Sequence, residues 1–578
     1  MRAYLREGPL AGGGQAPLPA SPVEGRTGGR AEPALRVHHE WMASVANIND
    51  VLEGHVALEI ECVDRLYLNA YVPALQVGGQ VVRFLCGHLG YEIPSTALFQ
   101  RIGNRFRREV SAFAAARNIP VLQLKKPDRS RWDDRKLDHV RPYLDRAERE
   151  GCYGVVAIVA CQEFQWVFAA RNRSKKPGVA SLDFFKEERR VGTYYFYILD
   201  PDFGPGFIKL CTYAPWPGKV WLNGHEWVKR QATRDGLAYQ ALHNGFASCP
   251  DPERLQAICD SFGPEHVQAF FDRWIVQVPT PLTGEDLVAG YWWELSMRQV
   301  EISRTLVLDA PRRARAFFEA LVQDNVGIGR PEEVSIVFAR RLRRPTRHPY
   351  GTRIFTTGTE VRIDFRYKHS RFKQYLKDGR ALRIETVINK PKDLGVLARL
   401  EHLPELIDKA RAVNHRLLMI EQAGQSCAIG SALFERIHQP QHEGQRTGAL
   451  RFGDKRAIAL AGALCHLLPA VTGFTNKSLR GLVAGHLGHD YNQRQMSYDL
   501  RRLRLHGLIT RLPRSNTYVH TPDGIRVAVF YTKLQNRLLR PLLDADNPPA
   551  PTDVRRALKT LESTVNTYVT NARLAPTS

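Results

Sequence analysis

The strongest constraint on the fold is the alternation of two hydrophobic periods along the chain. Between Met42 and about residue 330, segments rich in β-branched and aromatic residues alternate with segments whose apolar residues recur at helical spacing. Residues 56–72 indicate a long strand or a hairpin, residues 95–117 a helix, and residues 153–170 a strongly apolar strand. The sequence therefore predicts a mixed α/β protein with several domains.

Weaker signals complete this pattern. Residues 251–330 are expected to be mainly helical, and residues 334–395 are expected to turn to β-structure. Further strands are expected at 119–124, 194–199, 207–213 and 219–222, a helix near 138–150, and a helix capped by Asn223.

Composition and pattern divide the chain into six segments. The first 41 residues are rich in Gly, Pro and Ala and are expected to be disordered, which makes Met42 an alternative start. The other expected segments are a mixed α/β domain at 42–330, a basic α+β region at 331–437, a linker at 438–453, a winged helix-turn-helix at 454–545 and a helical tail at 546–578.

Positive charge is concentrated in two of these segments. The formal net charge is +23, from 82 Lys and Arg against 59 Asp and Glu. Residues 331–395 hold +9 of it and residues 441–578 hold +11. Charge localised in this way predicts a polyanionic partner, and nucleic acid is the usual one. No lipidation motif or basic amphipathic anchor predicts binding to a membrane.

Residues 454–540 show an ordered series of signals. Helices are expected at 455–468, 477–487 and 493–506, then short strands at 508–512 and 517–520, and then a helix that begins near Pro522. Three helices followed by a β-ribbon resemble the winged helix-turn-helix of MarR-like regulators and of many recombinases. The resemblance covers about 85 residues and implies a module that binds DNA.

The third helix of this series supports contact with DNA. Met496, Leu500 and Leu503 recur at i, i+4 and i+7 and are expected to face the core. The polar residues then face outward, where Arg and Gln can donate hydrogen bonds to purine edges. The alternative is an ordinary solvated face in a module that only dimerises. The predicted DNA-binding residues are Gln493, Arg494, Ser497, Arg501, Arg504, Arg511 and Arg514.

A second basic stretch lies at 339–392, where cations and aromatic residues interleave between two expected strands. Such a hairpin can follow a phosphate backbone, and the alternative is a solvated amphipathic hairpin. Its candidate contacts are Arg340, Arg341, Arg343, Arg344, Lys368, Arg371, Lys373 and Lys377. The segment KQYLKDGRALRIE is similar to a hairpin of some plasmid and phage replication proteins, although their His-x-His pair is absent here. Tyr375, Arg380, Glu385 and Lys392 resemble in order, though not in spacing, a residue set of one large group of DDE transposases.

Carboxylates in strand settings are candidate metal ligands. Phosphoryl transfer with two metal ions needs carboxylates that gather around the ions, and a carboxylate within an apolar strand is costly to bury unless it is paired or metal-bound. The alternative is that each one is neutralised locally or belongs to a turn. The candidate catalytic residues are Asp64, Glu163, Asp200, Asp202 and Glu385, and Mg²⁺ is the expected cofactor if the chain is a nuclease.

Other classes of protein lack support. No P-loop, dinucleotide-binding fingerprint or CxxC occurs, and the nine scattered cysteines fit a reducing, cytoplasmic setting. No apolar stretch is long enough to span a membrane. We therefore expect a DNA-binding protein of DNA mobility, recombination or replication, similar to a transposase, whose partner is duplex DNA. A non-enzymatic regulator with a large sensor domain and an RNA-binding protein are the alternatives, and a homo-oligomer is compatible with each.

Overall fold

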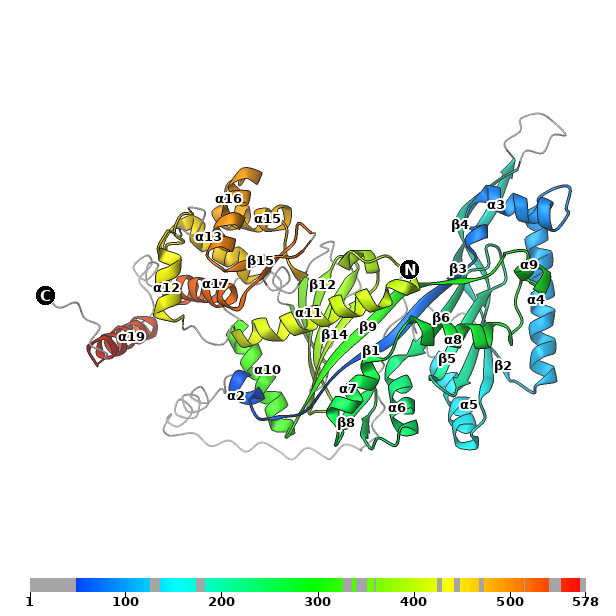
Figure 1. Ribbon diagram of the computed structural model, residues 1–578, viewed down its shortest axis with the longest axis horizontal. Helices are drawn as coiled ribbons and strands as arrows, with labels where there is room; N and C mark the ends of the chain where they lie inside the picture. Colours follow the sequence, from blue (N-terminus) through cyan, green and yellow to red (C-terminus); the bar gives the residue numbers. More distant parts are fainter. Residues whose placement is uncertain are drawn as a thin grey trace, which may run out of the picture. The chain divides into compact units, whose positions relative to one another are not determined.

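The computed structural model of the protein divides into two compact units (Figure 1). Among the described residues, the first unit comprises 60–302 and 388–407, and the second comprises 48–59, 303–387 and 408–571. Strands that begin in one unit continue into the other, because the division cuts β1 (Val56–Tyr71), β9 (Glu294–Leu308) and β14 (Ala381–Ile388). The described residues are 48–124, 136–172, 182–325, 335–338, 351–357, 360–423, 429–440, 447–466, 472–513, 515–539 and 552–571.

A large mixed sheet provides the framework. Its twelve described strands lie in the order β10-β11-β12-β13-β14-β9-β1-β6-β5-β4-β3-β2. Most of the neighbouring pairs are antiparallel, whereas β2 with β3 and β10 with β11 are parallel. The remaining strands of this sheet are β2 (Val121–Gln123), β3 (Gly154–Asn172), β4 (Leu182–Asp200), β5 (Gly204–Cys211), β6 (Gly218–Asn223), β10 (Ser335–Phe338), β11 (Gly351–Thr357), β12 (Glu360–Tyr367) and β13 (Ser370–Lys377). The expected mixed α/β class is confirmed.

Helices of the first unit pack on this sheet through their apolar faces. Helix α4 (Thr96–Ala116) is capped by Ser95, whose hydroxyl accepts a hydrogen bond from the Ala97 amide. Gly103 lets α4 approach the sheet closely, because a Cβ at this position would lie 2.3 Å from the Thr212 carbonyl oxygen. The other helices of this unit are α3 (Gly78–Val82), α5 (Lys136–Glu150), α6 (Gly224–Arg234), α7 (Pro252–Asp260), α8 (Pro264–Ile275) and α9 (Gly284–Val288).

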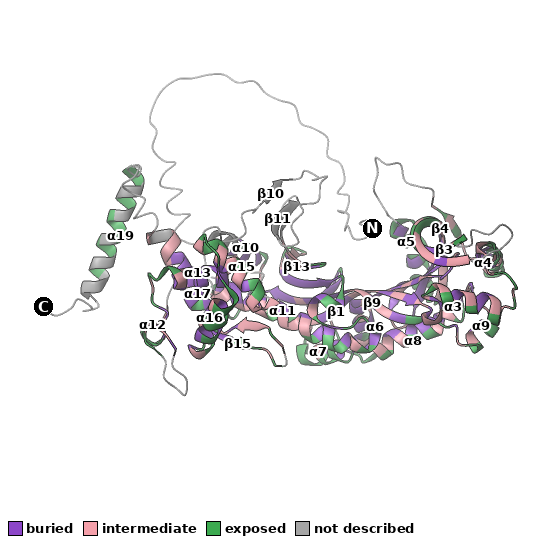
Figure 2. Ribbon diagram, turned by 90° about the horizontal axis from the view of Figure 1, so that it is seen from above, coloured by how far each residue is buried: buried purple, intermediate pink, exposed green. Residues whose placement is uncertain are grey.

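The hydrophobic core of the first unit follows the strands. Figure 2 shows buried residues along β9 and exposed residues on the outer sides of α7 and α8. One apolar cluster joins Val140 and Leu144 of α5 to Val159 of β3 and Tyr195 of β4. The predicted strand at 56–72 is a single strand, β1. Asn223 caps α6 as expected, because its side chain accepts hydrogen bonds from two backbone amides of the first turn.

The second unit holds two apolar clusters. The first joins α2 (Ile48–Leu52), α10 (Pro311–Asn325) and α11 (Leu403–Ala423) to β13 and β14. The second lies in residues 429–534 and includes α12 (Ser431–His438) and α13 (Lys455–Cys465). It continues through α15 (Asn476–Leu487), α16 (Gln493–Leu505), β15 (Ile509–Arg511), β16 (Tyr518–His520) and α17 (Pro522–Leu534). Helix α19 (Thr552–Asn571) ends the described chain.

Secondary structure in the C-terminal region follows the expected order. The predicted helices at 477–487 and 493–506 correspond to α15 and α16, and their caps are Thr475 and Asn492. Strands β15 and β16 pair antiparallel, and α17 begins at Pro522. The positions of these helices and strands were therefore predictable from their periodicity and capping residues.

Five strands were missed, among them the short β7 (Gln240–Leu242) and β8 (Gly245–Ser248), which pair with each other. Strand β9 lies within a segment that was expected to be mainly helical, so the prediction for 251–330 is wrong at residues 294–308. Its burial pattern shows no regular alternation, because both of its faces are largely covered. Residues 334–395 do form β-structure as expected, but strands were expected only at 334–338, 360–367 and 381–388, so β11 and β13 were missed. The basic run between the last two predicted strands is itself β13.

Among the described helices, none combines the length and the apolar character that crossing a membrane requires.

Candidate functional site

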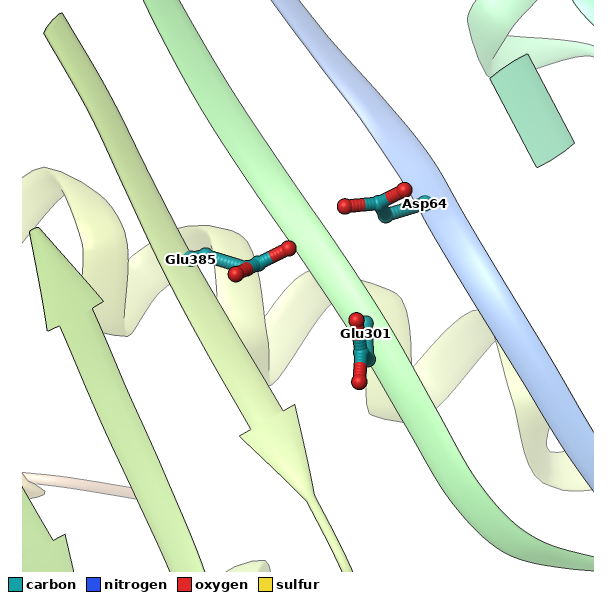
Figure 3. Close-up of side chains that lie close together, drawn as sticks. All are labelled: Asp64, Glu301 and Glu385. Atoms are coloured by element: carbon teal, nitrogen blue, oxygen red, sulfur yellow. The ribbon is translucent and has the colours of Figure 1, made fainter. Parts of the chain in front are cut away.

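Three buried carboxylates from adjacent strands lie close together. Asp64 of β1, Glu301 of β9 and Glu385 of β14 each offer an oxygen atom, and these atoms all lie within 4.8 Å of one another. Figure 3 shows the three side chains converging from three separate strands. Asp64 and Glu385 were expected from the sequence, whereas Glu301 was missed together with its strand.

Each of these carboxylates has polar partners. The Asn244 amide donates a hydrogen bond to Asp64, and the Arg65 guanidinium lies 3.9 Å from Asp64 and 3.8 Å from Glu301. The Lys373 ammonium donates to Glu385 Oε2 at 3.1 Å. Three carboxylates in one buried place repel one another, so they require positive charge, protonation or a cation. Oxygen ligands of this kind suit Mg²⁺ or Mn²⁺.

Glu163, another candidate ligand, lies in an ion pair instead. Lys136 Nζ donates to Glu163 Oε1 at 2.6 Å, Lys209 donates to Oε2, and the Tyr195 hydroxyl donates to Oε1 at 2.8 Å. Burial alone would raise the pKa of Glu163, but the two ammonium groups outweigh it and lower that pKa well below its usual range. These partners saturate the carboxylate, so its role is to neutralise two buried lysines.

Asp200 and Asp202 shape the turn between β4 and β5. Asp200 Oδ1 accepts the backbone amides of Asp202 and Phe203, and Oδ2 accepts the Trp274 indole N–H at 2.7 Å. The Arg273 guanidinium bridges both carboxylates, with N–O distances of 2.9 and 2.8 Å. The structure therefore supports the alternative for both, that they are turn residues neutralised locally.

The basic hairpin is less open than expected. Lys373 is buried on β13, opposite Glu385 in the register with β14, so it neutralises that carboxylate rather than meeting a phosphate. Arg371 and Lys377 are half-buried, and Lys368 is exposed in the turn before β13. The other predicted contacts, Arg340, Arg341, Arg343 and Arg344, lie outside the described residues.

Helix α16 separates its apolar side chains from its polar ones as predicted. Met496, Leu500 and Leu503 are buried in the core of the C-terminal region. All the predicted contact residues on α16 are exposed, namely Gln493, Arg494, Ser497, Arg501 and Arg504. Arg511 on β15 is exposed as well. Arg502 between them is buried, and its guanidinium donates to the Gly448 carbonyl at 3.0 Å. Two arginines of the Arg501–Arg504 run are thus on the surface while a third anchors the helix.

A buried carboxylate fixes the orientation of α16. Asp499 is fully buried and accepts hydrogen bonds from the Tyr491 hydroxyl and from Arg456 Nε, the latter at 2.7 Å. Burial raises the pKa of Tyr491, and Asp499 raises it further. This contact ties α16 to the first turn of α13, so the exposed row of α16 is held by a charge-assisted bond.

Three predicted contacts need separate comment. The Asn476 amide of α15 donates to Ser497 Oγ at 2.9 Å, so the Ser497 hydroxyl already joins α15 to α16. Arg511 donates to the Ser515 carbonyl at 2.8 Å and to the Asn516 side chain at 2.9 Å, and it thereby closes the connection between β15 and β16. Arg514 lies outside the described residues.

Two histidines at α13 and α15 have depressed pKa values. The imidazole Nε2 atoms of His466 and His486 lie 3.2 Å apart, and Gly462 leaves room for the His486 ring against α13. Burial, together with the neighbouring His486, lowers the pKa of His466 to about 4. Burial likewise lowers the pKa of His520 on β16 to about 4.

These histidines predict a loss of stability in acid. The unfolded chain protonates them near pH 6.5, whereas the folded chain resists protonation down to about pH 4. Stability is therefore complete above pH 6.5 and falls as the pH drops toward 4, by up to about 1.4 kcal/mol per pH unit for each group. Hydrogen exchange of α13, α15 and β16 in the full chain should show this slope. His466→Asn should reduce the slope by about half, because His520 still contributes, and an equal slope in that variant would contradict the assignment.

Comparison with known proteins gives no match to this chain. No protein-family model matches the sequence, and the searches of curated proteins and of solved structures returned no significant match.

Proposed function

We propose that this chain binds duplex DNA through α16. The observation that carries the proposal is the division of α16 into a buried row, Met496, Leu500 and Leu503, and an exposed row that includes Gln493, Arg494 and Arg501. A helix with donors on one face can lie in a major groove, where Arg pairs with guanine and Gln with adenine. The residues at the start of a recognition helix are those that read base edges.

The short strands that follow α16 fit the same proposal. In a winged helix-turn-helix, a β-ribbon lies next to the recognition helix and contacts the sugar–phosphate backbone. Arg511 on β15 is exposed, and its bonds to the connection between β15 and β16 hold the ribbon in one shape. Such contacts would position α16 without reading the sequence.

The size of the rest of the chain favours a role beyond site binding. We assign the chain to DNA mobility, recombination or replication, in a manner similar to a transposase. A module that only binds DNA requires neither the mixed sheet nor the three buried carboxylates of Asp64, Glu301 and Glu385. A regulator whose large domain senses a ligand is the alternative, and it would have the same α16.

Fluorescence anisotropy with labelled duplexes of random sequence tests the proposal. The full chain should bind duplex DNA, and its affinity should fall linearly with the logarithm of the salt concentration, because each neutralised phosphate releases a counterion. Structured RNA should compete weakly. Absence of duplex binding at low salt, or tighter binding to the RNA, would contradict the proposal.

A second candidate function is metal-dependent cleavage or joining of DNA, which the grouping of Asp64, Glu301 and Glu385 favours. Two-metal phosphoryl transfer uses carboxylates from different strands in this way. With Mn²⁺, labelled DNA should be cleaved or joined, and chelation should stop the reaction. Asp64→Asn should lower the rate by at least about a hundredfold while duplex binding stays unchanged. Asp202→Asn is the matched control, because that carboxylate lies in an ion pair elsewhere. Equal rates in Asp64→Asn and the unaltered chain would contradict this role.

A further inference from the structure

Two large aromatic side chains lie open on strand β3. Phe164 is 66% exposed and Trp166 is 56% exposed. They occupy alternate positions of one strand, so they share a face and are roughly 6.6 Å apart along it. Of the next residues of this strand on the same face, Phe168 is buried and Ala170 is half-buried. Exposed apolar side chains that lie next to each other, unlike single scattered ones, are typical of an interaction surface.

Arginines flank these rings on the same face. In the register of β3 with β4, Phe164 lies opposite Arg190, which is exposed, and directly opposed side chains of an antiparallel pair lie on one face. Gln162 lies opposite Gly192. The Arg107 guanidinium of α4 covers this glycine, with Nη2 3.6 Å from the place of a Cβ. The rings therefore lie next to two cationic groups, with Glu188 opposite Trp166 as the one acidic residue of the facing β4 positions.

Helix α4 adds to the positive charge of this face. Phe106 of α4 packs edge-to-face on Tyr194 of β4, with ring centroids 5.6 Å apart. Tyr194 and Arg190 are an even number of positions apart on β4, so α4 lies on the face that carries the open rings. Figure 1 shows α4 running beside the ends of β3 and β4. Its exposed residues include Arg101, Arg107, Arg108 and Glu109, and of these Arg107 lies against β4 at Gly192.

The open part of β3 is accessible from the side as well. Strand β2 pairs with β3 only at residues 158–160. Among the described residues, no strand pairs with this side of residues 161–167, which leaves Phe164 and Trp166 at the edge of the sheet, and the edge is next occupied where the Phe168 amide donates to the Ala214 carbonyl at 3.0 Å. Within the part of the chain that the structure describes, a ligand chain therefore meets no neighbouring strand beside residues 161–167 of β3.

We propose that this face of β3 and β4 binds single-stranded DNA. Unpaired bases can stack on Phe164 and Trp166, and the guanidinium groups of Arg190 and Arg107 can neutralise the phosphates between them. Duplex DNA fits this face poorly, because its bases already stack on one another. The choice of DNA over RNA rests on the proposed function, since a protein that opens or moves DNA must hold a single strand.

The charge of the face argues against an apolar protein partner. A peptide that adds a strand to the edge of β3 would gain backbone hydrogen bonds there, but such pairing does not require Arg190 and Arg107 beside the two rings. Rings interleaved with guanidinium groups suit a ligand that carries both π-faces and negative charge.

Binding of labelled oligothymidine by the full chain tests the proposal. The double variant Phe164→Ser/Trp166→Ser should lower the affinity for oligothymidine by at least about tenfold, because it removes both rings and with them the stacking contact that each ring makes with a base. The conservative variant Phe164→Tyr/Trp166→Phe should retain most of the affinity. Trp292→Ser is the matched control, because Trp292 is 53% exposed in the same unit but lies outside this face.

The outcomes separate this face from α16. Affinity for duplex DNA should stay the same in the Phe164→Ser/Trp166→Ser variant, because duplex binding is assigned to α16. If the unaltered chain did not bind duplex DNA, the proposed function would fail, while the oligothymidine measurement would still test the face of β3 and β4. An unchanged affinity for oligothymidine would overturn the proposal. So would tighter binding of oligouridine than of oligothymidine, which would point to RNA. Loss of self-association in the variant, measured by sedimentation, with unaltered oligothymidine binding, would identify the face as a contact between protein chains and would also overturn it.

Discussion

Replacing Arg494 and Arg501 by alanine should lower the affinity of the full chain for duplex DNA by at least about tenfold. Both side chains are exposed on the polar row of α16. A bidentate contact to guanine is worth about 1–3 kcal/mol, and a phosphate contact adds to the salt dependence of binding. The double variant should therefore bind more weakly and with a shallower slope of affinity against salt concentration.

The two single variants should affect different properties of binding, one the discrimination among sequences and the other the overall affinity. Arg494 lies in the first turn of α16, where a recognition helix reads base edges, so Arg494→Ala should reduce discrimination among duplex sequences. Arg501 lies two turns further along, so Arg501→Ala should lower the affinity for all duplex sequences alike. The slope of log affinity against log salt concentration should fall by the amount that roughly one phosphate contact contributes. Selection of bound duplexes from a random pool, followed by titration at several salt concentrations, measures both effects.

A matched control comes from the same region of the chain. Arg526 is exposed on α17 and is therefore not on the polar row of α16. Its replacement by alanine removes one positive charge, as Arg494→Ala does. Arg526→Ala should keep the affinity within about twofold. If Arg526→Ala and Arg494→Ala weakened binding equally, a diffuse electrostatic attraction rather than α16 would explain the affinity.

The C-terminal region was the most predictable part of the fold because its signals are local. Thr475 and Asn492 cap helices a few residues away, and the 3.6-residue period alone divides α16 into its buried and exposed rows. The same reasoning could not find β9, whose two covered faces leave no alternation to detect. One local signal was nevertheless available for Glu301, because it stands between Val300 and Ile302 in a run rich in β-branched residues.

The ion-pair partners of the buried charged side chains could not be predicted from the sequence. The partners of Glu163 come from α5 and β5, 27 residues before it and 46 residues after it, and only the pairing of strands brings them together. The same limit applies to Lys373, which was expected on the surface and is buried opposite Glu385. A single sequence shows that a charge stands in an apolar strand, but not whether its neutralising partner is a lysine, another acid or a metal ion.

The substitution Glu163→Gln should lower the free energy of unfolding of the first unit by about 3–5 kcal/mol. Gln keeps the volume of the side chain but leaves the ammonium groups of Lys136 and Lys209, which are 9% and 4% exposed, without a carboxylate. Removal of one partner from a buried ion pair is costly because the remaining charge stays buried and uncompensated. The urea dependence of hydrogen exchange in β3, β4 and β5 of the full chain measures the loss locally, since a chain of this size need not unfold in one step.

The pH dependence of that loss identifies its electrostatic origin. The pKa of Glu163 is lowered in the folded chain, so its stabilising effect is complete above the ordinary glutamic acid value of about 4.3 and declines as the pH falls below it. The difference between the unaltered chain and Glu163→Gln should therefore shrink by about 1.4 kcal/mol per pH unit below that value. Glu188→Gln on β4 is the matched control, because that carboxylate is exposed and its removal should cost less than about 0.5 kcal/mol. A loss in Glu163→Gln that stayed constant between pH 5 and pH 3 would mean that packing, rather than the two lysines, explains the effect.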